Sequence, residues 1–597
     1  MDSASCSKDN ENERKTYPIR KRIQTDKAVA SIINWVDKDV DTLSDSDIES
    51  SEEDDWTSDD GESANEEEAQ EADNNNVANT VAASSAEEAN QLPQQSPDIS
   101  DEETTSKKRK RGRPSLNQSN KVNNTNVPTS TSAKDKNAET QIDTWDELTS
   151  NCDTRKHDFR FAPKENSGIL CNLNGDSTPL DCFFELFDAE VQDLMINFIN
   201  SFAQNRLETK LPATRKSRFQ NWYPVTRYEL LKFFAVLMGI DKWPTIEEYW
   251  SLKDTLYSPW YSEQFTRNWF EIIYSSMLHA VFVKDEIEKK DKIEPFLNIV
   301  LDKFQAAFYP GQNLLLDEMV VKWKGRSRYR VYNPNKPEKY HLKTFGLCDS
   351  VTGYTYNLLI CFGADTSYTG ELDKGQSEKI FHNLLSPLGT GHHIFADRYY
   401  TTHSLVVNLT SKKTYYTGTL MSNRKGFPKK MATFKNLKHK ESKYYRSEKG
   451  ILLCAWKDKK ARKPVFAVST YAVKSESNVT NKSGKVTTKP DIIHDYNFSM
   501  NGCDRSDQML SYYNNFKRRT VKWWKRLFRW CIEVTQVNAF ILHCLTRYEG
   551  TKPFSLKKFK DKLIHQLINE ANTCIPDDHK HHVPKQPTAR NVRVQVT

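Results

Sequence analysis

The stretch NLLLDEMVVKWKG, residues 313–325, is the part of the chain from which the fold can be worked out. Its Leu, Met and Val residues are typical of a strand that is buried on both faces, and Gly325 marks its end. Asp317 stands in the middle of this apolar run. Because an unpaired carboxylate is costly in such surroundings, we expect Asp317 to have a functional partner. Glu318 is expected on the opposite face of the strand.

Six further elements follow this strand in a clear order. They are YHLKTFGLCDS (340–350), GYTYNLLICFG (353–363), SEKIFHNLLSPL (377–388), HHIFADR (392–398), TTHSLVVNLTSK (401–412) and TYYTGTL (414–420). With the first stretch, they predict three consecutive strands, a helix, a strand, a helix and a last strand. This order predicts an α/β fold with a mixed sheet covered by helices. Its first and fourth strands can be neighbours, which would set Asp317 beside Asp397.

A third aspartate, Asp504, lies in MNGCDRSDQML (500–510), where Gly502 precedes an expected helix. The three aspartates are 80 (397 − 317) and 107 (504 − 397) residues apart, so only the fold can bring them together. Gathered carboxylates repel one another unless a cation neutralises them. Such oxygen ligands suit Mg²⁺, and two ions can hold the attacking and leaving oxygens of a phosphoryl displacement. We therefore predict Asp317, Asp397 and Asp504 as metal ligands.

Charge is divided unevenly along the 597 residues. Residues 1–103 hold 8 basic and 29 acidic side chains, a net of −21, and residues 104–597 hold 78 and 51, a net of +27. A basic body of this kind indicates a nucleic-acid partner. The eleven cysteines form no Cys-x-x-Cys pair, so no zinc site is predicted, and no segment predicts a membrane span.

The first 145 residues are poor in apolar side chains, and we expect them to form a disordered acidic tail. Within this tail, KKRKRGRP (107–114) is typical of a nuclear localisation signal, which predicts a nuclear protein. Its Arg111-Gly112-Arg113-Pro114 core resembles an AT-hook, a segment that lies in the narrow minor groove of A·T-rich DNA. Arg111 and Arg113 are therefore predicted to bind DNA.

Helical periodicity dominates residues 170–300, where Asp181 is expected to cap a helix. The aromatic side chains of this region are expected to form a core. The predicted divisions are the tail (1–145), a helical dimerisation and DNA-binding domain (146–310), the core (311–410 and 495–510), an inserted subdomain (411–494), a C-terminal helical DNA-binding segment (511–570) and a second tail (571–597).

Basic and aromatic residues alternate in three places after the first strand. Positive charge binds phosphate without reading sequence, and aromatic rings can stack on displaced bases. The residues predicted to bind DNA in these places are Lys324, Arg326, Arg424, Lys425, Arg518, Arg519 and Lys522, and the last three lie beside Trp523 and Trp524.

Four segments carry a resemblance to a known family. They are LLLDEMVVKWKGRSRYRVYNPNKPEKYHLKTFGLCDSVTGY, IFADRYYTTHSLVVNL, YTGTLMSNRKGFPKK and DYNFSMNGCDRSDQMLSYYNNFKRRTVKWWKRLFRW. In residues, order and spacing they are similar to the piggyBac transposase family, and the strand order resembles the RNase H-like fold of many transposases and integrases.

The resemblance implies cut-and-paste transposition into TTAA targets with Mg²⁺ or Mn²⁺, double-stranded DNA as the partner, and a homodimer that joins two transposon ends. The catalytic aspartates of the family fall on Asp317, Asp397 and Asp504. A further aspartate of that site falls on Asp507, and a tryptophan at the target falls on Trp523.

One part of the family pattern is not matched. Many members continue into a Cys/His-rich, zinc-binding domain, whereas HHVPK (581–585) resembles only the residues that precede that domain. The sequence therefore leaves two further functions open. One is a domesticated, non-catalytic nuclear DNA-binding protein, and the other is a metal-dependent nuclease that cuts without joining.

Overall fold

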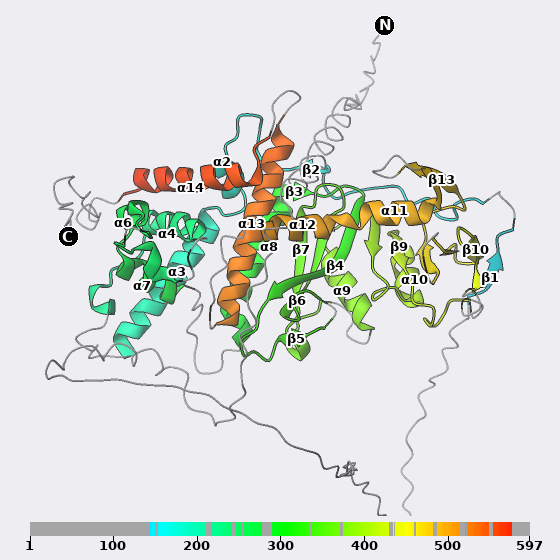
Figure 1. Cartoon of the computed structure of the whole chain (residues 1–597), viewed down its shortest axis with the longest axis horizontal. Coiled ribbons are helices and arrows are strands. Elements are labelled where there is room, and N and C mark those ends of the chain that lie inside the picture. The colour runs from blue at the N-terminus through cyan, green and yellow to red at the C-terminus, as the bar shows by residue number, and fades with distance from the viewer. Residues whose placement is uncertain are drawn as a thin grey trace, which may run out of the picture. The chain divides into compact units, whose positions relative to one another are not determined.

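The computed structural model (Figure 1) describes the chain from Asp143 to Ile575 with internal gaps. The gaps are 150–152, 210–217, 241–242, 244, 254, 278–288, 335, 370–373, 429–430, 432–433, 435, 459–460, 462, 481–485, 513–519, 521 and 548–552. The predictions made for the acidic tail, the basic cluster 107–114 and the segment 581–585 lie outside the described residues.

A ten-stranded mixed sheet is the centre of the fold (Figure 1). Its strand order is β1-β10-β11-β12-β9-β8-β4-β6-β5, and β7 pairs with β6. These strands are β1 (Trp145–Glu147), β4 (Asn313–Lys322), β5 (Arg330–Tyr332), β6 (Tyr340–Asp349), β7 (Thr355–Ile360), β8 (His393–Ala396), β9 (Tyr415–Thr419), β10 (Ser442–Ser447), β11 (Leu452–Trp456) and β12 (Val465–Ser469). The expected mixed α/β class is confirmed.

The segment 411–494, predicted as an inserted subdomain, continues this same sheet. β9 pairs in parallel with β8 and antiparallel with β12, so the ladder of hydrogen bonds passes from the core into this segment without a break. β11 is buried along its whole length, which joins the segment to the interior. β13 (Glu476–Thr480) and β14 (Val486–Pro490) form a separate hairpin.

Helices cover the sheet and form the region before it. They are α2 (Pro179–Phe184), α3 (Ala189–Thr209), α4 (Arg227–Gly239), α5 (Ile246–Tyr249), α6 (Pro259–Gln264), α7 (Arg267–Ser276), α8 (Glu294–Ala307), α9 (Gln376–Leu385), α10 (His403–Ser411), α11 (Asp491–Ser499), α12 (Asn501–Tyr512), α13 (Trp523–Thr546) and α14 (Leu556–Thr573). None of the described helices has the length and apolar character needed to cross a membrane.

The start of α2 corrects one sequence-based expectation. Thr178, not Asp181, is the residue that caps this helix, and its hydroxyl accepts a hydrogen bond from the Asp181 amide. The Asp181 carboxylate accepts in return from the Thr178 amide at 2.7 Å. Together they form a capping box, in which the acidic residue stands three positions inside the helix and supports its first turn.

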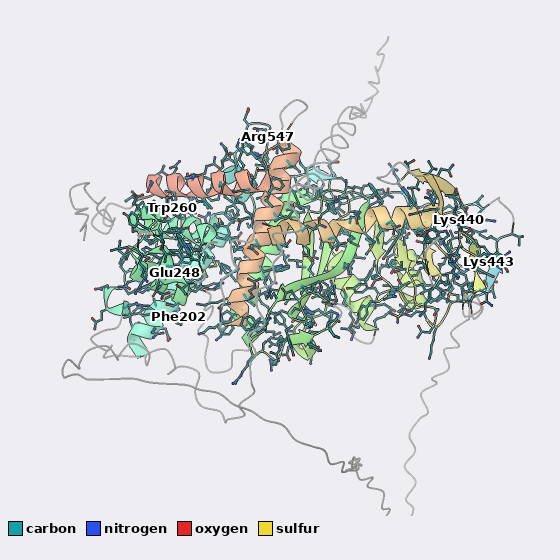
Figure 2. All side chains as sticks on the ribbon, in the orientation of Figure 1. Phe202, Glu248, Trp260, Lys440, Lys443 and Arg547 are labelled. Atoms are coloured by element: carbon teal, nitrogen blue, oxygen red, sulfur yellow. The ribbon has the colours of Figure 1, made fainter. Side chains whose placement is uncertain are left out.

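Helix α13 is buried over almost its whole length and explains why the C-terminal segment contributes to the core. It packs against α2, α8, α12, α14 and β4, so other elements surround it on several sides. Two of its cationic residues, Lys525 and Arg529, are consequently buried. Figure 2 shows Arg547 at the end of this helix, where its guanidinium donates to the carbonyls of Gly175 and Ser177.

A strap, residues 153–169, runs from the β10–β12 part of the sheet to the short strand pair β2 (Gly168–Ile169) and β3 (Phe308–Tyr309). Ala162 exchanges two backbone hydrogen bonds with Thr390, at 2.9 and 3.2 Å. The Arg155 guanidinium lies 3.7 Å from the ring centre of Tyr471. These contacts connect residues of the strap to residues more than 200 positions later in the chain.

Candidate active site

Two parallel strands place the first two aspartates. β4 and β8 pair in parallel, and their register runs up to Leu316 opposite Ala396. Asp317, inside β4, and Asp397, directly after β8, are the next residues after this register pair, so they lie on neighbouring strand paths at the same level. This is the neighbour relation expected from the sequence. Glu318 contacts His341 and Lys343, at 3.3 and 3.5 Å.

Helix α12 brings the other two aspartates to the sheet. It packs against β4 and β6, and a close approach at Gly502 allows this packing, because a Cβ there would lie 3.0 Å from the Asp349 carbonyl oxygen. Arg505 anchors the helix by donating to the Val351 carbonyl at 2.6 Å. Asp504 and Asp507 are three residues apart in its first turns and therefore share one side.

The Asp397 carboxylate is held in a fixed orientation. One of its oxygens accepts hydrogen bonds from the Arg398 amide at 2.6 Å and from the Thr419 hydroxyl at 3.1 Å. The Arg424 guanidinium donates to the carbonyls of Arg398 and Tyr399, at 3.3 and 2.6 Å. Arg424, which was predicted to bind DNA, thus stabilises the turn that follows Asp397 through these two hydrogen bonds.

The carboxylates are close enough to act on one another electrostatically. Burial raises the pKa of Asp317 to about 6, and the charges of Asp397 and Asp504 add to this shift. Burial also raises the pKa of Asp507 to about 7, with the charges of Asp504 and Asp317 acting in the same direction. The four residues therefore form one acidic site at the junction of β4, β8 and α12.

Lys336 is a residue of this site that no sequence pattern indicated. Its ammonium opposes the upward pKa shifts of both Asp317 and Asp507, so it lies near these two carboxylates. It belongs to the loop between β5 and β6, where its amide donates to the Asn333 carbonyl. The sequence signal was weak, because a single lysine in a Pro-containing loop is usually exposed to solvent.

The donor chemistry of the acidic site suits a divalent metal ion. Carboxylate oxygens are the hard ligands that Mg²⁺ prefers, and mutual repulsion between them is relieved by a cation. Among the described residues, however, no three His, Cys, Asp or Glu side chains stand close enough to hold one ion together. The roles of Asp317, Asp397 and Asp504 as metal ligands therefore stay a prediction.

For the metal-free protein, we expect the stability to fall as the pH rises from about 4 to about 7. A carboxyl with a raised folded-state pKa stabilises the fold below its unfolded pKa, near 4, and this stabilisation is lost as the pH passes the folded pKa. Those folded pKa values are about 6 for Asp317 and about 7 for Asp507. Since one pKa unit corresponds to about 1.4 kcal/mol, Asp317 contributes roughly 3 kcal/mol.

Thermal unfolding in EDTA across this pH range measures the effect. Added Mg²⁺ is expected to raise the unfolding midpoint at about pH 7.5 and to change it little at about pH 5, where protons compete for the carboxylates. A midpoint in EDTA that does not change with pH would contradict the expectation.

The residues predicted to bind DNA are distributed over several environments. Lys324, Arg326, Lys425 and Lys522 are exposed. Trp523 is 4% exposed and packs edge-on against Tyr329, with ring centres 5.0 Å apart. Contact of Trp523 with target DNA stays a prediction. Arg111, Arg113, Arg518 and Arg519 lie outside the described residues.

The comparisons with known proteins agree with this architecture. The family described as Transposase IS4 matches residues 178–540. The human piggyBac transposable element-derived protein 3 is 22% identical over 410 residues, which cover 65% of this chain and 64% of that protein. Human piggyBac transposable element-derived protein 2 is 24% identical over 388 residues, or 61% of each chain. The matched part is thus less than two thirds of each relative.

One solved structure has a similar fold. It is the cryo-EM structure of a piggyBac transposase synaptic complex with hairpin DNA. Its TM-score is 0.58 at 23% sequence identity, and the match covers 70% of this chain and 86% of the other.

Proposed function

The chain belongs to the Transposase IS4 family, as a member of its piggyBac-derived group, and we propose that it cleaves DNA strands and joins them at TTAA sites. The observation that carries this proposal is that Asp317 on β4 and Asp507 on α12 are influenced by each other's charge or by the charges of Asp397 and Asp504. These carboxylates are the residue type that phosphoryl transfer with bound metal requires.

In this proposal, Asp317, Asp397 and Asp504 would hold Mg²⁺ or Mn²⁺, and Asp507 would support them. Such ions would supply activation of the attacking oxygen and stabilisation of the leaving oxygen in an in-line displacement at phosphorus. The hydroxyl of Thr419 and the amide of Arg398 keep the Asp397 carboxylate oriented. A carboxylate held in this way loses little conformational freedom when a ligand binds.

The surroundings of the acidic site support double-stranded DNA as the substrate. Lys324 and Arg326 are exposed in the loop that follows β4, and Lys425 is exposed near the turn after Asp397. Cations at these places can bind phosphates on either side of the strand that is cut. We further propose an RNase H-like core and a homodimer that joins two DNA ends, which are the arrangements expected from the resemblance to piggyBac transposases.

The flanks of the coding sequence provide the test. If inverted repeats bordered by TTAA are present there, a reporter gene interrupted by that element should be restored in cells that express the full chain. The excised fragment should also form in vitro with Mg²⁺ and disappear with EDTA. Binding to the repeats without excision would instead support a non-catalytic DNA-binding protein, and cleavage without joining would support a nuclease.

A further inference from the structure

Two exposed tyrosines form a pair at the edge of the catalytic sheet. Tyr332 on β5 and Tyr340 on β6 are directly opposite in register, and their ring centres are 4.8 Å apart. Tyr332 is 57% exposed and Tyr340 is 39% exposed. Each ring therefore keeps a large apolar surface in contact with water, even though the two rings contact each other.

A guanidinium group lies against this tyrosine pair. The Arg330 guanidinium lies 4.9 Å from the ring centre of Tyr340 and donates to the carbonyls of Lys324 and Gly325, at 2.9 and 3.3 Å. These contacts tie the loop that carries the exposed Lys324 and Arg326 to the aromatic rings. An aromatic platform next to guanidinium and ammonium groups is the usual composition of a surface that binds single-stranded nucleic acid.

The pair and the acidic site share one face of the sheet. Gly346 is the register partner of Asp317, and Tyr340 precedes Gly346 on the same strand by six residues. Because side chains alternate along a strand, residues separated by an even number point to the same face. At roughly 3.4 Å per residue, the pair lies about 20 Å along the strand from Asp317. Lys336, in the loop that joins the two tyrosine-bearing strands, lies near the carboxylates.

We propose that Tyr332 and Tyr340 stack on unpaired DNA bases of the strand that leads into the acidic site. This inference rests on the proposed function, since it names how the substrate of that same site is positioned. The bases must be unpaired, because the faces of bases in an intact duplex are already covered by their neighbours. Arg330 then binds the adjacent phosphate, and the planar rings accept any base without reading its sequence.

A purely structural role would give the pair different properties. A cross-strand tyrosine pair can stabilise an edge hairpin, but that role requires only that the rings contact each other. It would not make the protein prefer DNA with unpaired bases over an intact duplex. This preference therefore separates the two roles.

The experiment measures binding of the full chain to two DNAs, an intact duplex and the same duplex with four unpaired nucleotides that include 2-aminopurine. The protein carries Asp317→Asn, so that the strand is not cut during the measurement. Stacking on tyrosine is expected to change the 2-aminopurine fluorescence. Tyr332→Ala with Tyr340→Ala should abolish this change and weaken binding of the unpaired DNA about tenfold, with less than about twofold loss for the duplex.

Three further variants complete the design. Tyr332→Phe with Tyr340→Phe keeps both rings and should bind both DNAs as the unsubstituted protein does. Tyr332→Leu with Tyr340→Leu keeps apolar contact without a planar ring, and it replaces the alanine variant if that variant unfolds. Tyr257→Ala removes a tyrosine that is 52% exposed in the helical region and should change neither measurement.

Two results would overturn the inference. One is an equal loss of affinity for the unpaired DNA and the duplex, and the other is an unchanged fluorescence signal in the alanine or leucine variant. A failure of the proposed function has a different signature. In that case the unsubstituted protein shows no strand cleavage with Mg²⁺ or Mn²⁺, while the binding measurements still report on the tyrosines.

Discussion

Asp317→Asn or Asp397→Asn is expected to slow DNA strand cleavage by about a thousandfold or more and to change DNA affinity less than about twofold. Asparagine has almost the same shape as aspartate, so the strand and its packing are retained. It lacks the negative charge with which the aspartate is proposed to bind a divalent cation. The rate of strand cleavage on labelled DNA with Mg²⁺, followed by gel electrophoresis, measures the first quantity, and fluorescence anisotropy measures the second.

Glu318→Gln is the matched control for this prediction. Glu318 is the direct neighbour of Asp317, but its carboxylate contacts His341 and Lys343. Both substitutions replace a carboxylate by an amide, so they differ only in the position that is changed. Cleavage by this variant should stay within a few-fold of the unsubstituted rate. Full activity of the Asp317→Asn protein would remove Asp317 from the catalytic set. Equal inactivity of the Glu318→Gln protein would show that the assay reports on folding of β4 instead.

The second large effect is expected on stability, at Gly391. A Cβ at this position would lie 2.3 Å from the Arg160 carbonyl oxygen and 2.5 Å from the Phe161 Cα, both of which belong to the backbone of the strap. Its φ of +80° is also unfavourable for any residue with a side chain. Steric overlap and backbone strain each cost roughly 1–3 kcal/mol, so Gly391→Val should destabilise the protein by about 3 kcal/mol or more.

Two other glycines separate the two causes. Gly363 has φ +64° with no atom within 4 Å of its Cβ position, so Gly363→Ala reports backbone strain alone, about 1 kcal/mol. Gly375 has neither feature, and Gly375→Ala, at the N-cap of α9, should cost less than about 1 kcal/mol. Chemical denaturation gives the stabilities, and limited proteolysis shows whether the strap has detached from the core. The prediction fails if Gly391→Val is no less stable than Gly363→Ala.

The central strands could be predicted from the sequence because each one is a local pattern. The apolar run around Asp317 and the short run before Asp397 have the composition of buried strands, and their order in the chain allows them to be neighbours. A helix was expected after Gly502, and α12 begins slightly earlier, at Asn501. These features depend on residues close together in the chain, and the expected strands agree with β4 and β8.

Other features depend on contacts that no local pattern contains. The strap reaches the sheet because Gly389 and Gly391 leave room for its backbone. Segment 411–494 continues the sheet because β9 pairs with β8 on one side and with β12 on the other. Trp523 is buried against Tyr329, a residue far from it in the chain.

By itself, the sequence determined the family, the α/β class and the three aspartates around which a site could form, because composition, periodicity and motif spacing are written along the chain. Only tertiary contacts place Lys336 near those aspartates, hold Arg424 against the turn that follows Asp397, and leave two tyrosines exposed on the same face of the sheet. The reason is physical. The register of distant strands and the close approach of backbones set these positions, and both depend on the packing of the whole core.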